Sequence, residues 1–528
     1  MSKGHRKLFD ALEQLFHIRF EERDLGDDAG IDAWVLNGLD VKSAGMFTRS
    51  GLTCYTTINN VERIPCGESK IIEFSLNDAI PFVLRGRKIN TEEAAECMAL
   101  PPQLRCFSII ASKAGFPLWA IQESMHCRHH YVSMSIPELN DDEPLFRYFH
   151  GEQFLRLLPF FLFLRSLADD KGWEPPPLQA CFMFDDPNLH WPTYGFMKFA
   201  EMMRHAGTYK YHSSIATIPL DAWFFHKPTV SLFKEHRDRM SLLIHGNDHT
   251  SHELSQPCSE KERNQILLQA LLRIAAFERR SGLEVSKVMA PPHGACSEDF
   301  LRGMSNVGFE AACISRGSLR RDNRQAKWLT TIGIRSSDIV EGLTIFPRFA
   351  LSGNCHNSIL LAALLHQPII PVGHHEDISE GLQMLGDLST FVNSLGDVRW
   401  ANMSGISRSH FSRMTDGAIL RIRMHTRRVE VSVPEGTDRI RVERSRSEEV
   451  EPESFAWRIL EDKAEWKPCR SDQLITVPPG KKTEIVRPPP STSMDENTVR
   501  KFQLWPVMRR QVTEARDRVA PALRRFSI

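Results

Sequence analysis

The chain has 528 residues, which is enough for two or three domains. Apolar residues make up 41% and charged residues 25% of the sequence, as in ordinary globular proteins. Lys and Arg together number 66, as do Asp and Glu, so no excess of charge points to nucleic acid, and we expect no nucleic-acid partner.

Cysteine usage and hydropathy favour a cytoplasmic protein. Eleven cysteines are scattered without a Cys-x-x-Cys pair, which suits buried free thiols in a reducing compartment better than a disulfide framework. No apolar run near the N-terminus reaches the length of a signal peptide before Arg19 and Glu21 intervene. No apolar segment approaches the roughly 20 residues that span a bilayer.

Residues 1–150 are predicted to form a separate α/β domain of unknown role. The spacing of leucines over Lys7–Phe20 predicts a helix. Short apolar runs at Ala33–Leu36, Ile71–Phe74 and Cys106–Ile110 predict strands. No catalytic signature appears in this part of the sequence.

A second domain is predicted over residues 151–415. Glu152–Leu167 is rich in Leu and Phe and predicts a helix, and Glu174–Pro177 then breaks the chain. From there to about residue 405, apolar strands alternate with amphipathic helices such as Glu260–Arg279. This alternation predicts a parallel α/β sheet, most simply a (β/α) barrel.

Chemically active side chains follow several of these predicted strands. Asp185 and Asp186 come directly after an apolar run, and His245 does the same further along, with His249 four residues later. In such barrels the working residues sit at the carboxyl ends of the strands. Catalytic zinc commonly takes three protein ligands and leaves one place for water. Two imidazoles and one carboxylate therefore predict a site for a divalent metal, with the second carboxylate beside it.

Other histidines could complete the same site. His249 and His252 form an alternative pair three residues apart, and His190 and His293 are further possible ligands. An Asp-Asp pair at a strand end often caps a turn or helix, and a His-x-x-x-His can be coincidence in a chain with 21 histidines. Their joint occurrence at strand ends favours the metal site over these simpler explanations.

Four strand-end segments resemble the motifs of the polysaccharide deacetylases, the NodB-homology family also called carbohydrate esterase family four. The resemblance covers about residues 176–405. The family motifs Thr-Phe-Asp-Asp-Gly, His-Ser/Thr-x-x-His, Arg-x-Pro-Tyr-Gly and Leu-x-His correspond in order to Met183–Pro187, His245–His249, Ala290–Gly294 and Val372–His374. The resemblance implies that the predicted barrel is the deformed (β/α) barrel of this family.

The resemblance also implies a metal site and a base. Asp186, His245 and His249 would bind the metal, most simply zinc, and Asp185 would be the catalytic base. Neighbouring residues of an extended segment point in opposite directions, so one carboxylate can face the metal and the other the water and the substrate.

The remaining roles fall to residues of the third and last motifs. His374 would protonate the departing amine, with His375 as the rival for that role. Pro292 and His293 would lie at the substrate, beside a backbone N–H that stabilises the oxyanion, and His190 is a further candidate for substrate binding.

The sequence departs from the family pattern at the third motif. Ala290 stands where the family has an arginine that orients the base, so Asp185 needs another partner. His293 replaces a tyrosine. No segment matches the family's fourth motif, Asp-x-x-Asp-Trp, clearly; Arg321–Trp328 is the nearest.

These residues predict a metal-dependent hydrolase that removes an N-acyl group from a carbohydrate, such as a precursor of a surface polysaccharide. Two other functions remain open. One is a carbohydrate-binding barrel without turnover, which the missing arginine favours. The other is a metal-dependent sugar isomerase or epimerase, because barrels host many chemistries.

The C-terminal part is predicted to hold a small antiparallel β domain and a basic helix. Apolar and polar residues alternate over 416–487. Within 488–528, Pro488–Met494 reads as a linker, and 499–528 carries eight Lys and Arg against two acids, so its net charge is 8 − 2 = +6. Such a helix either docks on the body of the protein or rests peripherally on anionic lipid at the inner membrane face.

Overall fold

The computed structural model describes residues 2–24, 27–39, 52–58, 69–93, 97–98, 107–123, 127–168, 172–443, 454–460, 465–487 and 504–525. The predicted linker Pro488–Met494 lies outside these residues. The chain divides into two compact units. The first comprises Met1–Lys171, Thr330–Ile334 and Asn357–Leu364, and the second comprises the rest.

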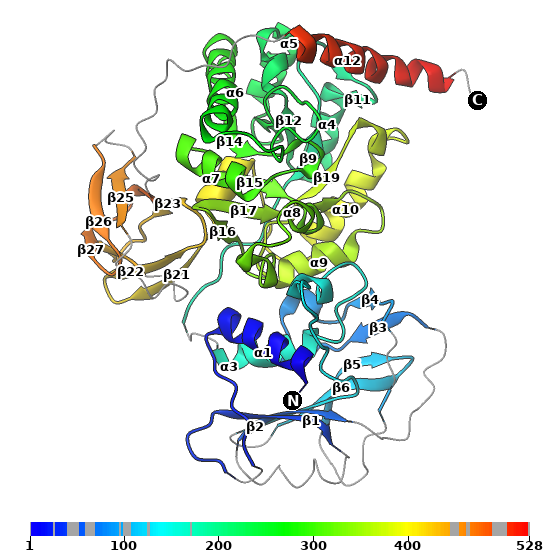
Figure 1. Ribbon diagram of the computed structural model, residues 1–528, viewed down its shortest axis with the longest axis vertical. Coiled ribbons are helices and arrows are strands. Elements are labelled where there is room, and N and C mark those ends of the chain that lie inside the picture. Colours follow the sequence, from blue (N-terminus) through cyan, green and yellow to red (C-terminus); the bar gives the residue numbers. More distant parts are fainter. Residues whose placement is uncertain are drawn as a thin grey trace. The chain divides into compact units, whose positions relative to one another are not determined.

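The described strands of the first unit form one mixed sheet in the order β1-β2-β7-β6-β5-β3-β4 (Figure 1). β1, β2 and β7 run parallel, and the remaining pairs are antiparallel. Their bounds are β1 Ala33–Leu39, β2 Thr53–Ile58, β3 Ile71–Phe74, β4 Lys88–Asn90, β5 Phe107–Lys113, β6 Phe116–Glu123 and β7 Arg128–Val132.

Two helices of the first unit pack through aromatic rings. α1 (Lys3–Phe16) starts before the predicted position because the side chain of Ser2 accepts a hydrogen bond from the backbone N–H of His5 and caps it. It ends where His17 takes a left-handed conformation, with φ 54°. Phe16 makes an edge contact with Phe161 of α3 (Leu158–Ala168).

The second unit is built on a nine-stranded sheet of described strands in the order β16-β17-β15-β14-β13-β12-β9-β19-β18. All neighbours are parallel except β16 and β17. The strands are mostly buried, as parallel strands usually are. Their bounds are β9 Phe182–Asp185, β12 Ser213–Thr217, β13 Met240–Ile244, β14 Val285–Met289, β15 Ala311–Ile314, β16 Asp338–Val340, β17 Leu343–Pro347, β18 Phe349–Ala350 and β19 Pro371–Gly373.

This sheet is not a closed barrel. Among the described residues no ladder joins β16 to β18, the two ends of the strand order. However, β17 and β18 are separated in the chain only by Arg348. The backbone N–H of Arg348 donates to Ile314 of β15, and the N–H of Phe349 donates to Ile370, next to β19. The chain therefore changes pairing partner at Arg348, and the expected deformed barrel has no closed sheet among the described residues.

Helices accompany the parallel strands of this unit (Figure 1). The helix that follows β9 starts only at Phe199, because Thr193–Lys198 forms a hairpin, β10 (Thr193–Tyr194) and β11 (Met197–Lys198), around Gly195. The helices of this unit are α4 Phe199–Tyr209, α5 Lys227–Glu235, α6 Glu260–Ser281, α7 Glu298–Val307, α8 Arg316–Asp322, α10 Gln383–Asn393, α11 Met403–Arg408 and α12 Leu504–Arg525. Apart from His356, α9 (His356–Leu364) belongs to the first unit. No helix in the described part of the chain is long and apolar enough to cross a bilayer.

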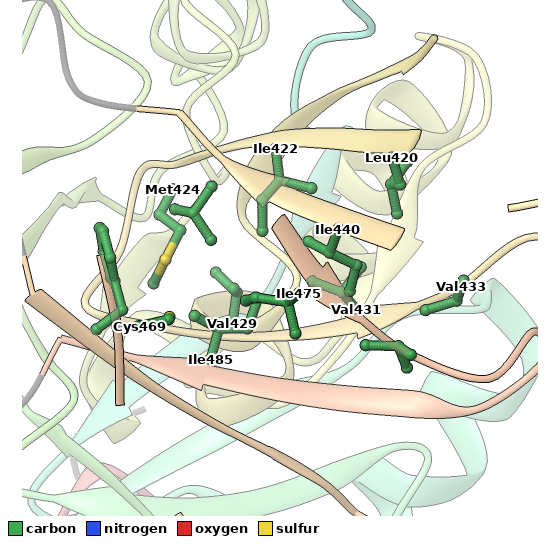
Figure 2. Close-up of a cluster of buried hydrophobic side chains, with 13 residues drawn as sticks. Leu420, Ile422, Met424, Val429, Val431, Val433, Ile440, Cys469, Ile475 and Ile485 are labelled. Carbon is green, nitrogen blue, oxygen red and sulfur yellow. The ribbon is translucent and has the colours of Figure 1, made fainter. Parts of the chain in front are cut away.

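The C-terminal strands form two four-stranded sheets around one apolar core. The orders are β21-β22-β24-β27 and β23-β28-β25-β26. β22 and β24 are parallel, so the predicted purely antiparallel arrangement is wrong for this pair. Figure 2 shows the buried side chains of both sheets gathered into one cluster. The bounds are β21 Phe411–Asp416, β22 Ile419–Met424, β23 Arg428–Ser432, β24 Arg439–Val442, β25 Ser454–Ile459, β26 Lys467–Arg470, β27 Leu474–Thr476 and β28 Lys482–Val486.

One cysteine departs from the expected pattern of free thiols. Cys97 is disulfide-bonded. Eight other cysteines among the described residues are free, and all of them except Cys258 are buried. The expectation of thiols without disulfides is therefore wrong for Cys97.

Candidate metal centre

The predicted strand-end residues meet at one edge of the parallel sheet. Asp185 ends β9 and Asp186 follows it, while His245 follows β13 and His374 follows β19. β19 is parallel to β9, and both β9 and β13 are parallel to β12. The carboxyl ends of β9, β13 and β19 therefore lie at the same edge of the sheet. Sequence segments far apart in the chain are brought together in this way.

Asp186, His245 and His249 form a compact group of possible metal ligands. Oδ1 of Asp186 lies 2.9 Å from Nε2 of His249 and 3.4 Å from Nε2 of His245. One ligand atom from each residue lies within 4.8 Å of the other two. Two imidazole nitrogens and one carboxylate oxygen are the ligand set of many catalytic zinc sites.

The hydrogen bonds around this group fit a cation. Nδ1 of His245 lies 2.7 Å from the carbonyl oxygen of Ala290, which can only accept, so Nδ1 carries the proton. In the neutral ring, Nε2 then presents a lone pair to Asp186. Oδ1 of Asp186 is buried and has no hydrogen bond of good geometry among the described residues. A lone pair and a carboxylate that face each other need a positive charge between them, which a metal ion supplies.

The pKa shifts express the same demand for positive charge. Burial lowers the pKa of His245, but the charges of Asp185 and Asp186 outweigh it and raise the pKa overall. Burial raises the pKa of Asp186, but the close rings of His245 and His249 outweigh it and hold the pKa well below its usual range. The pocket therefore favours the ionised form of Asp186.

The loop that carries His245 and His249 is held in place by hydrogen bonds to neighbouring side chains. The backbone N–H groups of Asn247 and Asp248 donate to the carboxylate of Glu253 at 2.6 and 3.0 Å. Gly246 has φ 64°, and a Cβ there would collide with the same carboxylate. Arg273 of α6 donates to Oδ1 of Asp248 at 2.7 Å. The loop thus has little freedom to move its two histidines apart.

Several residues of the site have strained backbones. Asp186 has φ 85°, His249 and His252 each have φ 54°, and His293 has φ 57°. Residues other than glycine rarely adopt such φ values, and these values persist only where the surrounding structure holds them. Their clustering at one edge of the sheet is typical of a functional site.

Asp185 is paired with an arginine that the sequence analysis missed. Nη1 of Arg348 lies 3.0 and 3.1 Å from the two carboxylate oxygens of Asp185, and both side chains are buried. Ala290 stands at the motif position expected to supply this arginine, and its carbonyl oxygen instead holds His245. The available signal was the apolar run Leu343–Phe346, after which Arg348 points to the same side as Phe346.

The two adjacent histidines of the last motif point to different surroundings. His374 is about half exposed, and its Nε2 lies 3.9 Å from Oδ2 of Asp186. His375 is buried and packs against Tyr194 and Phe196. The structure therefore brings His374, and not His375, to the Asp186 group.

The remaining predicted residues are divided between the rim and the interior. His293 is exposed and lies beside His249, with ring centroids 5.3 Å apart, while Pro292 next to it is buried. His252 stacks on His293 at 5.7 Å and is not among the grouped ligands. His190 is buried, donates from Nε2 to the carbonyl of Asp221 at 2.8 Å and does not belong to the Asp186 group.

Comparisons with known proteins give structural likeness only. No family model and no curated protein matches the sequence. Agd3, described as a novel carbohydrate deacetylase, is 10% identical with a TM-score of 0.42, and the match covers 84% of this chain and 86% of Agd3. A family 4 carbohydrate esterase from Streptomyces lividans is 11% identical with a TM-score of 0.26, covering 44% of this chain and 95% of the esterase.

The similar structures also include a protein without activity. BA3943 from Bacillus anthracis, described as a pseudoenzyme of carbohydrate esterase family four, is 9% identical with a TM-score of 0.27, covering 44% of this chain and 66% of BA3943. The chain thus resembles carbohydrate deacetylases over a segment.

Proposed function

We propose that the protein is a metal-dependent hydrolase that removes an N-acyl group from a carbohydrate. The observation that carries the proposal is the convergence of Asp186, His245 and His249 beside a second carboxylate, Asp185, that is paired with Arg348. The carbohydrate class rests on the resemblance of the four motifs, and a surface-polysaccharide precursor is the substrate that we favour. We propose zinc as the metal because the ligand set is two imidazoles and one carboxylate.

The residues can divide the work of amide hydrolysis. A metal at the three ligands would supply Lewis acidity to the reacting carbonyl group. Asp185 accepts a proton from water as the water oxygen bonds to the acyl carbon. Arg348, in contact with both oxygens of Asp185, orients the carboxylate for this step. His374 returns a proton to the nitrogen as the C–N bond breaks, and the products are a carboxylate and a free amine.

Metal content and acetate release test the proposal together. The purified protein should hold one zinc by elemental mass spectrometry and release acetate from N-acetylglucosamine oligomers. Asp185→Asn should keep the zinc and lose about 100-fold or more in kcat, since general-base catalysis contributes about 10²–10⁴-fold. His252→Asn is the matched control, because His252 is exposed, has the same positive φ as His249 and should leave zinc content unchanged. If the Asp185→Asn variant held zinc and released acetate as fast as the wild type, the mechanism would be contradicted.

The two rival functions predict different products. A carbohydrate-binding protein without turnover was favoured by the missing third-motif arginine, and the Arg348–Asp185 pair removes that support. Such a protein would bind the oligomers and release no acetate. A sugar isomerase or epimerase would change the configuration of the sugar and release neither acetate nor formate.

We further propose that the outward face of α12 rests on an anionic lipid surface. Arg510, Glu514 and Asp517 are buried against the body, whereas Trp505 and Val512 are 70% and 72% exposed. An exposed stripe recurs every three or four residues on the opposite face and consists of Trp505, Met508, Val512, Ala515 and Val519. One flank of the stripe is basic, with the exposed Arg516. Like charges would repel a second copy of the helix and attract anionic headgroups.

Vesicle binding tests this surface. The protein should sediment with vesicles of phosphatidylserine and phosphatidylcholine, and the double variant Trp505→Ser/Val512→Ser should not. Point variants are preferable to deletion of 499–528, because the buried face of the helix contacts the candidate metal centre. Sedimentation that is equal for both proteins contradicts lipid contact, and a loss of self-association instead would indicate a second copy as the occupant. A cytoplasmic location remains a prediction.

A further inference from the structure

The C-terminal helix binds the backbone of two of the three proposed ligands. Nη2 of Arg510 donates to the carbonyl oxygen of Asp186 at 2.9 Å. Nη1 of Arg509 donates to the carbonyl oxygen of His249. Asp186 and His249 lie on loops that leave different strands, β9 and β13. Two neighbouring arginines of α12 therefore tie together the two loops that must converge on a metal.

Arg510 is itself held in one orientation. Its Nε donates to Oδ2 of Asp221 at 2.8 Å, and its Nη2 also lies 3.2 Å from the hydroxyl of Tyr194. That hydroxyl donates to Oδ2 of Asp517, on the next turns of the same helix, at 2.8 Å. Arg510, Asp221 and Asp517 are all buried. The guanidinium cannot leave the Asp186 carbonyl without giving up this whole network.

The two carbonyl groups belong to residues whose backbones are strained. Asp186 has φ 85° and His249 has φ 54°. The φ value sets the direction in which each side chain leaves the loop, so a relaxed backbone would turn the ligand atom away. A charged donor on the carbonyl group of the same residue restrains the peptide and thus the side chain.

We propose that Arg509 and Arg510 are positioning residues, through which α12 sets the affinity of the centre for its metal. This inference rests on the metal site of the proposed function. Residues that orient metal ligands typically change affinity by 10–100-fold when they are replaced. Linkage then requires the reverse effect: metal binding should tighten the docking of α12.

The test uses the full chain and zinc alone. The dissociation constant for Zn²⁺ is measured by competition with a chromophoric chelator in the wild type, Arg509→Gln, Arg510→Gln and Arg510→Lys. We expect Arg509→Gln and Arg510→Gln each to weaken zinc binding about tenfold or more. Arg510→Lys should recover part of the loss, because an ammonium can still reach one acceptor. Arg516→Gln is the matched control, because Arg516 lies on the same helix, is exposed and bonds to Asp517; it should stay within about twofold of the wild type.

Amide hydrogen exchange of α12 supplies the second readout. Zinc should slow exchange in α12 of the wild type and have a smaller effect in Arg509→Gln. If Arg510→Gln does not fold, Arg509→Gln decides alone. Zinc binding within twofold of the wild type in the glutamine variants, an equal loss in Arg516→Gln, or a wild type that binds no zinc would each overturn the inference. If the glutamine variants weaken zinc binding but the wild type releases no acetate, the inference about α12 is supported and only the proposed hydrolase activity is contradicted.

Discussion

Among the described residues of the second unit lie two groups of metal-type ligands, and their aspartate oxygens differ in the hydrogen bonds that they already accept. The first is Asp186 with its two histidines, and the second is His375, Glu376 and Asp517. In the first, Oδ1 of Asp186 accepts no hydrogen bond of good geometry within the described residues. In the second, both oxygens of Asp517 are occupied, by Tyr194 at 2.8 Å and Arg516 at 2.7 Å.

The comparison shows that residue type and proximity do not make a metal site. Burial lowers the pKa of His375, so this ring is held neutral among Tyr194 and Phe196, and Gly195 leaves room for it. Glu376 is largely exposed. A ligand oxygen that is already hydrogen-bonded gives up that bond when it binds a cation. We therefore place the proposed metal at the first group, and four predictions test the contrast.

The largest effect should come from the buried charge pair beside the first group. Arg348→Met should destabilise the protein by about 3–5 kcal/mol, because it leaves Asp185 buried and unpaired. Arg516→Met, beside the second group, should cost less than about 1 kcal/mol, because Arg516 is exposed. Urea unfolding measures both. The double variant Arg348→Met/Asp185→Asn should regain most of the stability, and a fully additive loss would argue against the pair.

The second-largest effect should come from the removal of one proposed metal ligand. Structural zinc sites gain roughly 10–16 kcal/mol from four ligands, so removal of one should cost about 3 kcal/mol, or about 100-fold in affinity. His245→Ala should show this loss in a chelator titration. Glu376→Gln should bind zinc as the wild type does. A loss in Glu376→Gln that matches His245→Ala would place the metal in the second group.

Two glycines packed against the groups should separate folding from metal binding. A Cβ on Gly246 would meet the carboxylate of Glu253, and a Cβ on Gly195 would meet the ring of His375. Both have positive φ, so each alanine variant should cost about 1–2 kcal/mol from the backbone alone. Only Gly246→Ala should also weaken zinc binding, since Gly246 lies in the loop of His245 and His249. Equal zinc binding in both variants would show that this loop is more adaptable than its contacts indicate.

The smallest effect concerns pH and the docking of α12. Burial lowers the pKa of His190, but Glu514 and the carbonyl of Asp221 raise it above 6.5 overall, while the pKa of Glu514 falls to about 2. The folded protein thus holds this proton more tightly than the unfolded chain. The His190–Glu514 pair contributes its full stabilisation of the folded protein below pH 6.5. This stabilisation is lost as the pH rises through the raised pKa of His190.

His190→Gln should therefore lower the melting temperature most in acid, by an amount equivalent to about 1 kcal/mol, and progressively less as pH rises. Thermal unfolding between about pH 5.5 and pH 9 measures this difference. A difference that grows with pH would mean that His190 is neutral in the folded protein.

The sequence predicted the parts of the site that have a local sequence pattern. Apolar runs followed by Asp185 and His245 mark the ends of parallel strands, and parallel strands bring such ends together. Arg348 also follows an apolar run, Leu343–Phe346, but one arginine among 66 Lys and Arg carries no motif that would name its partner. Its partner lies far away in the chain, and only the fold reveals the pair.

Other departures have the same cause. The sequence predicted a deformed barrel, and the described residues form no closed sheet, because the segment at Arg348 shares its hydrogen bonds between two neighbours. The predicted role of α12 remained open because an amphipathic helix does not reveal which of its faces is inward. Here the charged residues Arg510 and Glu514 are buried and the apolar stripe is outside, which is the reverse of the usual arrangement.

The segment that passes from β17 to β18 should tolerate no change in length. Side chains alternate along it, so a single inserted or deleted residue between Phe346 and Arg348 would turn the guanidinium outward. The same shift would put the backbone out of step with both neighbouring strands. We expect homologous chains to vary freely in the surface loops but to keep the number of residues in 343–350 constant.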